Sequence, residues 1–187
     1  LISRSELVEI GGSFRVPDIM EASGAILREV GTTNRTYVAD YEQAVNDRTA
    51  AILKVHRSNF RVSGFTHEAT TQELADLAHR HDLPCWFDMG SATFGPMPDD
   101  LPTECDVRTE LEAGIDVGCF SGDKLLGGPQ SGILVGRKTA IEQLATHPMA
   151  RALRVGKLTI AGLQDVLLAY RRGQSEHVVL SAMLNAD

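Results

Sequence analysis

In Val117-Gly118-Cys119-Phe120-Ser121-Gly122-Asp123-Lys124 a short apolar run is followed by a lysine in a glycine-rich turn. The apolar run predicts a buried strand, and the polar residues after it predict the loop at the carboxyl end of that strand. A lysine at such a point can be partly desolvated, which lowers its pKa and makes its amine a nucleophile that forms Schiff bases. Position alone favours the other interpretation, in which Lys124 is a surface loop lysine.

A second apolar run, Cys85-Trp86-Phe87, follows Pro84 and ends at Asp88. A carboxylate at the end of a buried strand is costly unless it has a partner. One suitable partner is a protonated pyridine nitrogen, because pyridoxal phosphate (PLP) needs an acidic residue there to act as an electron sink. The other interpretation of Asp88 is a buried residue that caps the following turn.

Outward from these two strands, short apolar runs alternate with helical patterns along the whole chain. This alternation predicts an α/β fold, with a mostly parallel sheet and helices on both faces. In such sheets the ligand site lies beyond the carboxyl ends of the strands, so we expect it among residues 56–59, 88–91 and 121–130. Strands are expected at 7–10, 50–55, 85–87, 117–120 and 133–135, and helices from Pro17, from Asp40, after Thr70 and over 157–172.

Length and composition limit the possible functions. The 187 residues, 43% of them hydrophobic, suit one ordinary domain with a packed core. The net charge of −7 does not favour a basic nucleic-acid-binding module. No apolar run approaches the roughly 18 residues that span a bilayer. Because the sequence starts at Leu1 without a signal-peptide pattern, we expect it to be the middle of a longer chain.

Cysteine and histidine spacing predicts neither a disulfide framework nor a metal site. The three cysteines show no C-x-x-C spacing, which favours free thiols in a reducing, cytoplasmic compartment. His79 and His81 are two residues apart and would lie on different faces of a helix. The seven acidic residues within 99–116 predict a solvated helix with its preceding loop.

The segment from Ser121 to Gln130 resembles the PLP-lysine segment of bacterial selenocysteine synthases, the L-seryl-tRNA(Sec) selenium transferases. The similarity extends to Val30-Gly31-Thr32-Thr33-Asn34-Arg35 and to His147-Pro148-Met149-Ala150-Arg151-Ala152-Leu153-Arg154, and covers residues 1 to about 172. The resemblance implies the large domain of a PLP-dependent transferase with the aspartate-aminotransferase architecture (fold type I) over residues 1–172. Residues 173–187 would then form a linker and the start of a smaller C-terminal domain.

The resemblance also implies which residues bind the cofactor. Lys124 would hold PLP covalently, Asp88 would pair with the pyridine nitrogen, and Ser121 would contact the phosphate. His56 or Asn59 would lie near the ring or its 3-oxygen. Ser91, which follows the same strand as Asp88, is a further cofactor-binding candidate.

Three further residues would serve the second substrate. Asp123 would lie near the selenium donor, and Arg151 and Arg154 would hold the phosphoryl group of selenophosphate. Their spacing of three residues would put both arginines on one helix face, and arginine suits bidentate phosphate contacts.

The implied reaction is the PLP-dependent conversion of seryl-tRNA(Sec) into selenocysteinyl-tRNA(Sec) with selenophosphate, through a dehydroalanyl-tRNA intermediate. Lys124, once free, would be the general base for the α-proton of the seryl group. The family assembles as a homo-oligomer built from dimers, with its tRNA-contacting surface mainly outside these residues. Two alternatives stay open: a PLP-dependent lyase or aldolase that acts on a free amino acid, and a non-catalytic homologue.

Overall fold

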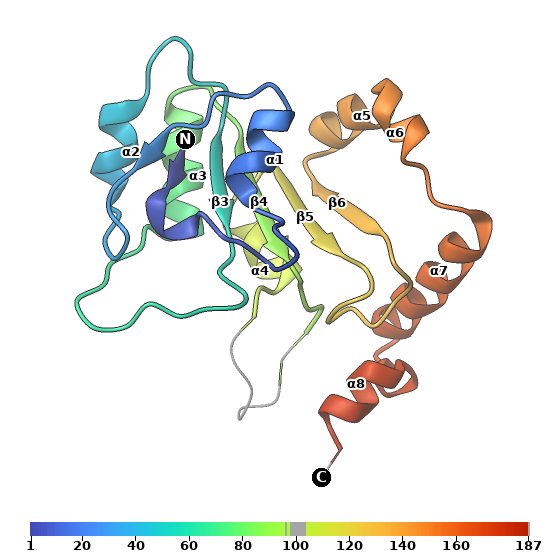
Figure 1. The fold of residues 1–187 in the computed structure, drawn as a ribbon. Coiled ribbons are helices and arrows are strands. Elements are labelled where there is room, and N and C mark those ends of the chain that lie inside the picture. Colours follow the sequence, from blue (N-terminus) through green and yellow to red (C-terminus); the bar gives the residue numbers. More distant parts are fainter. Residues whose placement is uncertain (96, 98–103, 187) are drawn as a thin grey trace. The chain divides into compact units, whose positions relative to one another are not determined.

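The computed structural model describes residues 1–95, 97 and 104–186 (Figure 1). The chain divides into two compact units that are interleaved in the sequence. Unit 1 comprises Leu1–Asp88 together with Glu112–Asp116, and unit 2 comprises Met89–Leu111 together with Val117–Asp187. The change from one unit to the other therefore first occurs within a strand, β4 (Cys85–Gly90).

Unit 1 is built on parallel strand pairs. Strand β1 (Ile2–Ser3) pairs with β2 (Glu29–Val30), and β3 (Ile52–Val55) pairs with β4 so that Val55 lies opposite Asp88. Its buried centre includes Ile2, Val8, Val16 and Val55. The helices of this unit are η1 (Arg4–Glu6), α1 (Val16–Ala22), α2 (Val38–Ala44) and α3 (Thr71–Arg80).

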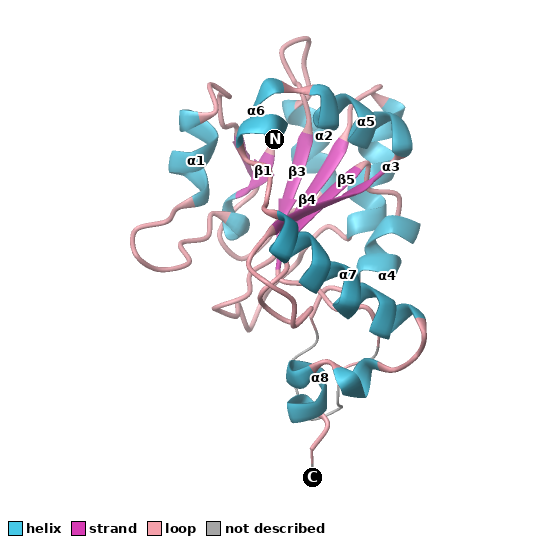
Figure 2. Cartoon of the chain, turned by 90° about the vertical axis from the view of Figure 1, so that its right-hand side faces the viewer, coloured by secondary structure: helices cyan, strands magenta, loops and turns pink. Residues whose placement is uncertain are grey.

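Unit 2 contains an antiparallel strand pair followed by helices. Strand β5 (Val117–Ser121) pairs with β6 (Gly132–Gly136), with Ser121 opposite Gly132. Figure 2 shows the helical segments that follow β6 in the sequence. They are α5 (Lys138–Thr146), α6 (Pro148–Ala152), α7 (Lys157–Arg171), η2 (Ser175–His177) and α8 (Val179–Leu184). Helix α4 (Val107–Glu112) precedes β5.

The sheet is mixed, with the strand order β3-β4-β5-β6. Strands β3 and β4 are parallel as predicted, but β6 runs antiparallel to β5. The reason is the short connection over residues 122–131, because a parallel crossover needs a dozen or more residues and usually a helix. None of the helices in the described part of the chain is long and apolar enough to cross a membrane.

Local signals predicted the start of α3 correctly. Thr70 and Glu73 form a capping box just before the helix that was predicted after Thr70: Glu73 N donates to Thr70 Oγ1 over 3.2 Å, and Thr70 N donates to Glu73 Oε2 over 2.8 Å. For α2 the predicted start at Asp40 was wrong. The helix begins at Val38, and the Asp40 carboxylate instead accepts a hydrogen bond from Tyr37 N over 2.7 Å.

The prediction of a strand at residues 7–10 is wrong. The segment makes only an isolated bridge between Glu9 and Arg15, because Gly11, Gly12 and Ser13 all have positive φ and turn the chain back at once. The described strand at this end is β1, five residues earlier.

The acidic run over 99–116 is only partly the solvated helix that we predicted. Helix α4 is present, residues 99–103 lie outside the described residues, and Asp116 is only 7% exposed. Its Oδ2 accepts a hydrogen bond from Cys85 N over 2.8 Å and lies 3.0 Å from His79 Nε2. Asp116 therefore anchors the start of β4 to α3 within unit 1. Cys85 and Cys105 are buried, whereas Cys119, which lies in an apolar run like Cys85, is half-buried.

Candidate functional site

The loop after β3 carries two of the predicted cofactor residues, His56 and Asn59, in unit 1. His56 is half-buried, and its backbone N–H donates to the Asp88 carbonyl oxygen over 2.9 Å. Asn59 is exposed, and its Nδ2 donates to the Glu9 carbonyl oxygen over 2.8 Å. The structure therefore brings His56 next to the backbone of Asp88 at the carboxyl end of two parallel strands. This is where an α/β sheet places its ligand site.

The lysine loop lies in unit 2. Lys124 Nζ donates to the Gly90 carbonyl oxygen over 3.2 Å, and Leu125 N donates to Ser91 Oγ over 3.2 Å. These two bonds join residues 124–125 to residues 90–91, which belong to two of the segments among which the ligand site is expected. Gly90 is the last residue of β4, two positions after Asp88 in the same strand.

The side chain of Lys124 is exposed, which agrees with the interpretation that its position alone favoured, a lysine in a surface loop. The turn that follows β5 carries Asp123 and Lys124 outward, and the neighbouring buried positions are Gly122 and Leu126. Asp123 is exposed as well, and Ser121, at the end of β5, is half-buried.

The glycines of this loop allow the backbone to pack closely against itself. Gly122 N donates to Ser131 O and Gly128 N donates to Gly122 O, both over 2.8 Å. A Cβ atom on Gly122 would lie 2.3 Å from Ser131 Oγ and 2.9 Å from Pro129 O. The Gly122 amide therefore already has a backbone acceptor, the carbonyl oxygen of Ser131.

The two predicted phosphoryl-binding arginines do not share a helix face. Arg151 lies in α6, which ends at Ala152, and Leu153 is its C-terminal cap. Arg154 therefore lies beyond the helix, and the argument from a spacing of three residues is wrong. Both side chains are exposed.

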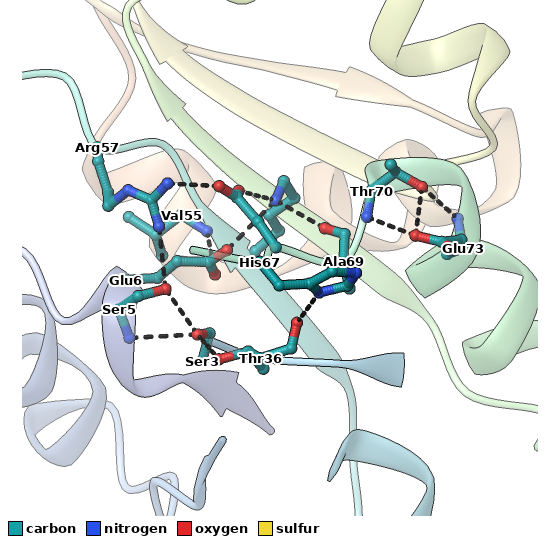
Figure 3. A network of polar contacts seen from close by, with 12 residues as sticks. Ser3, Ser5, Glu6, Thr36, Val55, Arg57, His67, Ala69, Thr70 and Glu73 are labelled. Atoms are coloured by element: carbon teal, nitrogen blue, oxygen red, sulfur yellow. Dashed lines mark hydrogen bonds and ion pairs between the residues drawn. The ribbon is translucent and has the colours of Figure 1, made fainter. Parts of the chain in front are cut away.

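An ionic cluster in unit 1, whose centre of Glu6 and Lys54 is buried, was not predicted from the sequence (Figure 3). Lys54 is 7% exposed, and its Nζ lies 3.3 Å from Glu6 Oε1 and 2.6 Å from Glu68 Oε1. Lys54 Nζ also donates to the Ala69 carbonyl oxygen over 3.3 Å, and Arg57 Nη2 pairs with Glu68 Oε2. One signal could have found the cluster: a lysine within the buried strand 52–55 must have a charged partner.

Burial and pairing act in opposite directions on these charges. Burial raises the pKa of Glu6, against the opposing effects of Lys54 and of the Val55 N–H. For Lys54 burial disfavours the charge, but Glu6 and Glu68 outweigh it and raise its pKa. Burial alone would raise the pKa of Glu68, but the positive charges of Lys54 and Arg57 outweigh this effect and hold the pKa below the ordinary value.

The family model for L-seryl-tRNA selenium transferase matches residues 1–187. The chain is 50% identical over 193 residues to the L-seryl-tRNA(Sec) selenium transferase of Aquifex aeolicus, covering 100% of this chain and 42% of that protein. It is 54% identical over 172 residues to the enzyme of that name from Geobacter metallireducens, covering 91% of this chain and 37% of that protein. The chain thus spans about two fifths of the length of these curated relatives.

Solved structures agree on the fold. D-glucosaminate-6-phosphate ammonia-lyase matches with a TM-score of 0.71 and 28% identity, over 92% of this chain and 43% of that one. A Thermus thermophilus aspartate aminotransferase matches with a TM-score of 0.64 and 17% identity, over 98% of this chain and 45% of that one, which shows the fold alone. The predicted aspartate-aminotransferase-like fold is confirmed, and the match along the whole chain shows that it belongs to the L-seryl-tRNA selenium transferase family.

Proposed function

We propose that the protein containing this chain is a PLP-dependent enzyme that converts seryl-tRNA(Sec) into selenocysteinyl-tRNA(Sec) with selenophosphate. The observation that carries the proposal is the bond from Lys124 Nζ to the Gly90 carbonyl, at the end of the strand that holds Asp88. By their chemistry, the Lys124 amine suits the aldehyde of PLP, the Asp88 carboxylate suits its pyridine nitrogen, and the hydroxyls of Ser91 and Ser121 suit its phosphate.

Each residue would then have one task. PLP, when bound, supplies an electron sink for the α-carbon of the seryl group. Lys124 would hold the cofactor and later take the α-proton from the substrate. Asp88 would keep the pyridine nitrogen protonated. Four side chains would hold the phosphate or the ring: Ser121, Ser91, His56 and Asn59.

The substrates are proposed from the names of the relatives. Asp123 would lie beside the selenium donor, and Arg151 and Arg154 would bind its phosphoryl group by charge-assisted hydrogen bonds. Their exposure leaves both guanidinium groups accessible to an anion. We also propose a cytoplasmic homo-oligomer built from dimers, with the large domain over residues 1–172 and a linker with the start of a small domain over 173–187.

The test uses the full-length protein loaded with PLP. Lys124→Ala should abolish the absorbance band of lysine-bound PLP, whereas Lys157→Ala, an exposed lysine at the start of α7, should keep it. A band that survives Lys124→Ala unchanged would refute the assigned role of this lysine.

A second candidate is a PLP-dependent lyase that acts on a free amino compound, because the structural match at 28% identity is to an ammonia-lyase. Incubation of the full-length enzyme with free serine and with seryl-tRNA(Sec) separates the two. We expect turnover of seryl-tRNA(Sec) alone, and comparable turnover of free serine would contradict the tRNA substrate.

A further inference from the structure

A short N-terminal segment, Ser5–Glu9, holds the loop that follows β3. Glu6 Oε2 accepts a hydrogen bond from Val55 N over 3.0 Å, and Ser5 Oγ accepts one from Arg57 Nη1 over 2.9 Å. The Glu9 carbonyl completes the set through its bond to Asn59 Nδ2. Contacts from this one segment therefore lie on both sides of His56.

The side chain of Glu6 accepts a hydrogen bond from β3 at a point beyond the end of β1. Ile52 N and His56 N donate toward β4, to the carbonyls of Pro84 and Asp88, whereas Leu53 N donates to the opposite side, to Leu1 O. Val55 N points to that opposite side as well, because successive N–H groups of a strand alternate. Since β1 has already ended at Ser3, the Glu6 carboxylate accepts the bond in place of a strand carbonyl.

The ionic cluster fixes the Glu6 carboxylate in this position. Glu6 is 1% exposed, and the ammonium of Lys54 lies beside it. Lys54 is itself bonded to Glu68, which Arg57 also binds. Because Glu6 and Lys54 are both buried, the removal of either one changes the charge balance of the other.

We propose that Glu6 and Lys54 are positioning residues that hold the His56–Asn59 loop in the geometry that PLP requires. The inference rests on the proposed function, in which His56 and Asn59 lie near the cofactor ring. Glu6 acts through Val55, the residue before His56, and Lys54 acts through Glu6. A merely structural role would lower stability and leave the environment of bound PLP unchanged.

The test compares two buried acids of unit 1 in the full-length protein. Glu6→Gln should weaken PLP binding about tenfold and change the visible circular dichroism of bound PLP, which reports the orientation of the ring. Asp116→Asn is the matched control, because Asp116 is also buried and accepts from a backbone N–H, but at the start of β4. It should lower the melting temperature and keep the PLP affinity and dichroism of the wild type.

Wild-type PLP affinity and dichroism in folded Glu6→Gln would overturn the inference. If that variant does not fold, Arg57→Lys replaces it, since lysine keeps the charge that faces Glu68 but lacks the fork that also reaches Ser5. Arg57→Lys should show a smaller change in the same two readouts, and wild-type values there would overturn the inference as well. Absence of PLP binding by the wild-type protein would instead overturn the proposed function and, with it, this inference.

Discussion

At the scale of single residues, Asp116 is the clearest structural anchor of unit 1. Its buried carboxylate accepts from Cys85 N and contacts His79, so its removal leaves a buried N–H without an acceptor. We expect Asp116→Ala to lower the free energy of unfolding by about 1–3 kcal/mol. Chemical denaturation of the full-length protein at pH 7 measures this. Asp165→Ala, at an exposed position in α7, should change stability by no more than about 0.5 kcal/mol, and an equal loss in both variants would contradict the assignment.

Arg151 carries a prediction about the second substrate. If its guanidinium binds the phosphoryl group of selenophosphate, Arg151→Ala should raise the KM for selenophosphate about tenfold and leave PLP affinity unchanged. Steady-state kinetics and PLP titration give the two values. Arg171→Ala, at the exposed end of α7, should change neither. Equal losses of selenophosphate use and PLP binding in Arg151→Ala would count against the phosphoryl contact.

At the scale of elements, the loop between β5 and β6 depends on a glycine that accepts no side chain. A Cβ on Gly122 would meet Ser131 Oγ and the Pro129 carbonyl, whereas one on Gly132 would meet nothing within 4 Å. Gly122→Ala should therefore destabilise the loop that carries Lys124, by about 1–3 kcal/mol for such overpacking, and reduce the occupancy of lysine-bound PLP. Gly132→Ala should leave both unchanged. Thermal unfolding and PLP absorbance test the pair, and equal behaviour of the two variants would contradict the packing argument.

The capping box of α3 makes the stability of this element depend on pH. Hydrogen bonds from the Thr70 backbone and side chain hold the pKa of Glu73 below its ordinary value. A carboxyl whose pKa is lower in the folded state stabilises the fold above its unfolded pKa, near 4.5, and loses that effect as the pH falls through the folded value. The stability difference between wild type and Glu73→Ala should therefore be largest near pH 7 and shrink on acidification.

Denaturation at a series of pH values measures this difference. Thr70→Ala, which removes the other half of the box, should cost about 0.5–2 kcal/mol at pH 7. Glu73→Gln keeps an acceptor oxygen without a titrating group, so its stability relative to Glu73→Ala should not vary with pH over this range. A difference between wild type and Glu73→Ala that is constant with pH would exclude the ionised carboxylate as the capping group.

Elements that rest on local signals could be predicted from the sequence, and those that need a distant partner could not. The cap of α3 and the apolar runs of β3, β4 and β5 are local patterns, and the structure confirms them. The prediction of a strand at residues 7–10 was wrong, because the chain turns back at Gly11 and this segment pairs with Arg15 only through an isolated bridge. The cluster of Glu6, Lys54 and Glu68 is assembled from residues far apart in the chain, so no periodicity indicates it.

At the scale of the whole molecule, the two units cannot be separated by one cut in the chain. Unit 1 takes residues 112–116 from within the sequence of unit 2. Those residues supply Asp116, which accepts from Cys85 N, and Gly114, where an added Cβ would lie 3.3 Å from the Cβ of Ala75 in α3. A fragment of residues 1–88 therefore lacks groups that its own strand β4 and helix α3 contact.

The interleaving predicts how fragments of this chain fold. Residues 1–88 alone should unfold with low cooperativity, because the buried Cys85 N–H has lost its acceptor. Residues 1–88 joined to 112–116 by a flexible glycine-serine linker of about ten residues, long enough to return along β4, should unfold more cooperatively and at a higher temperature. Circular dichroism on heating compares the two fragments. The linked fragment carrying Asp116→Ala should melt at a lower temperature and less cooperatively, as the 1–88 fragment does. Equal melting of all three fragments would show that unit 1 does not need residues 112–116.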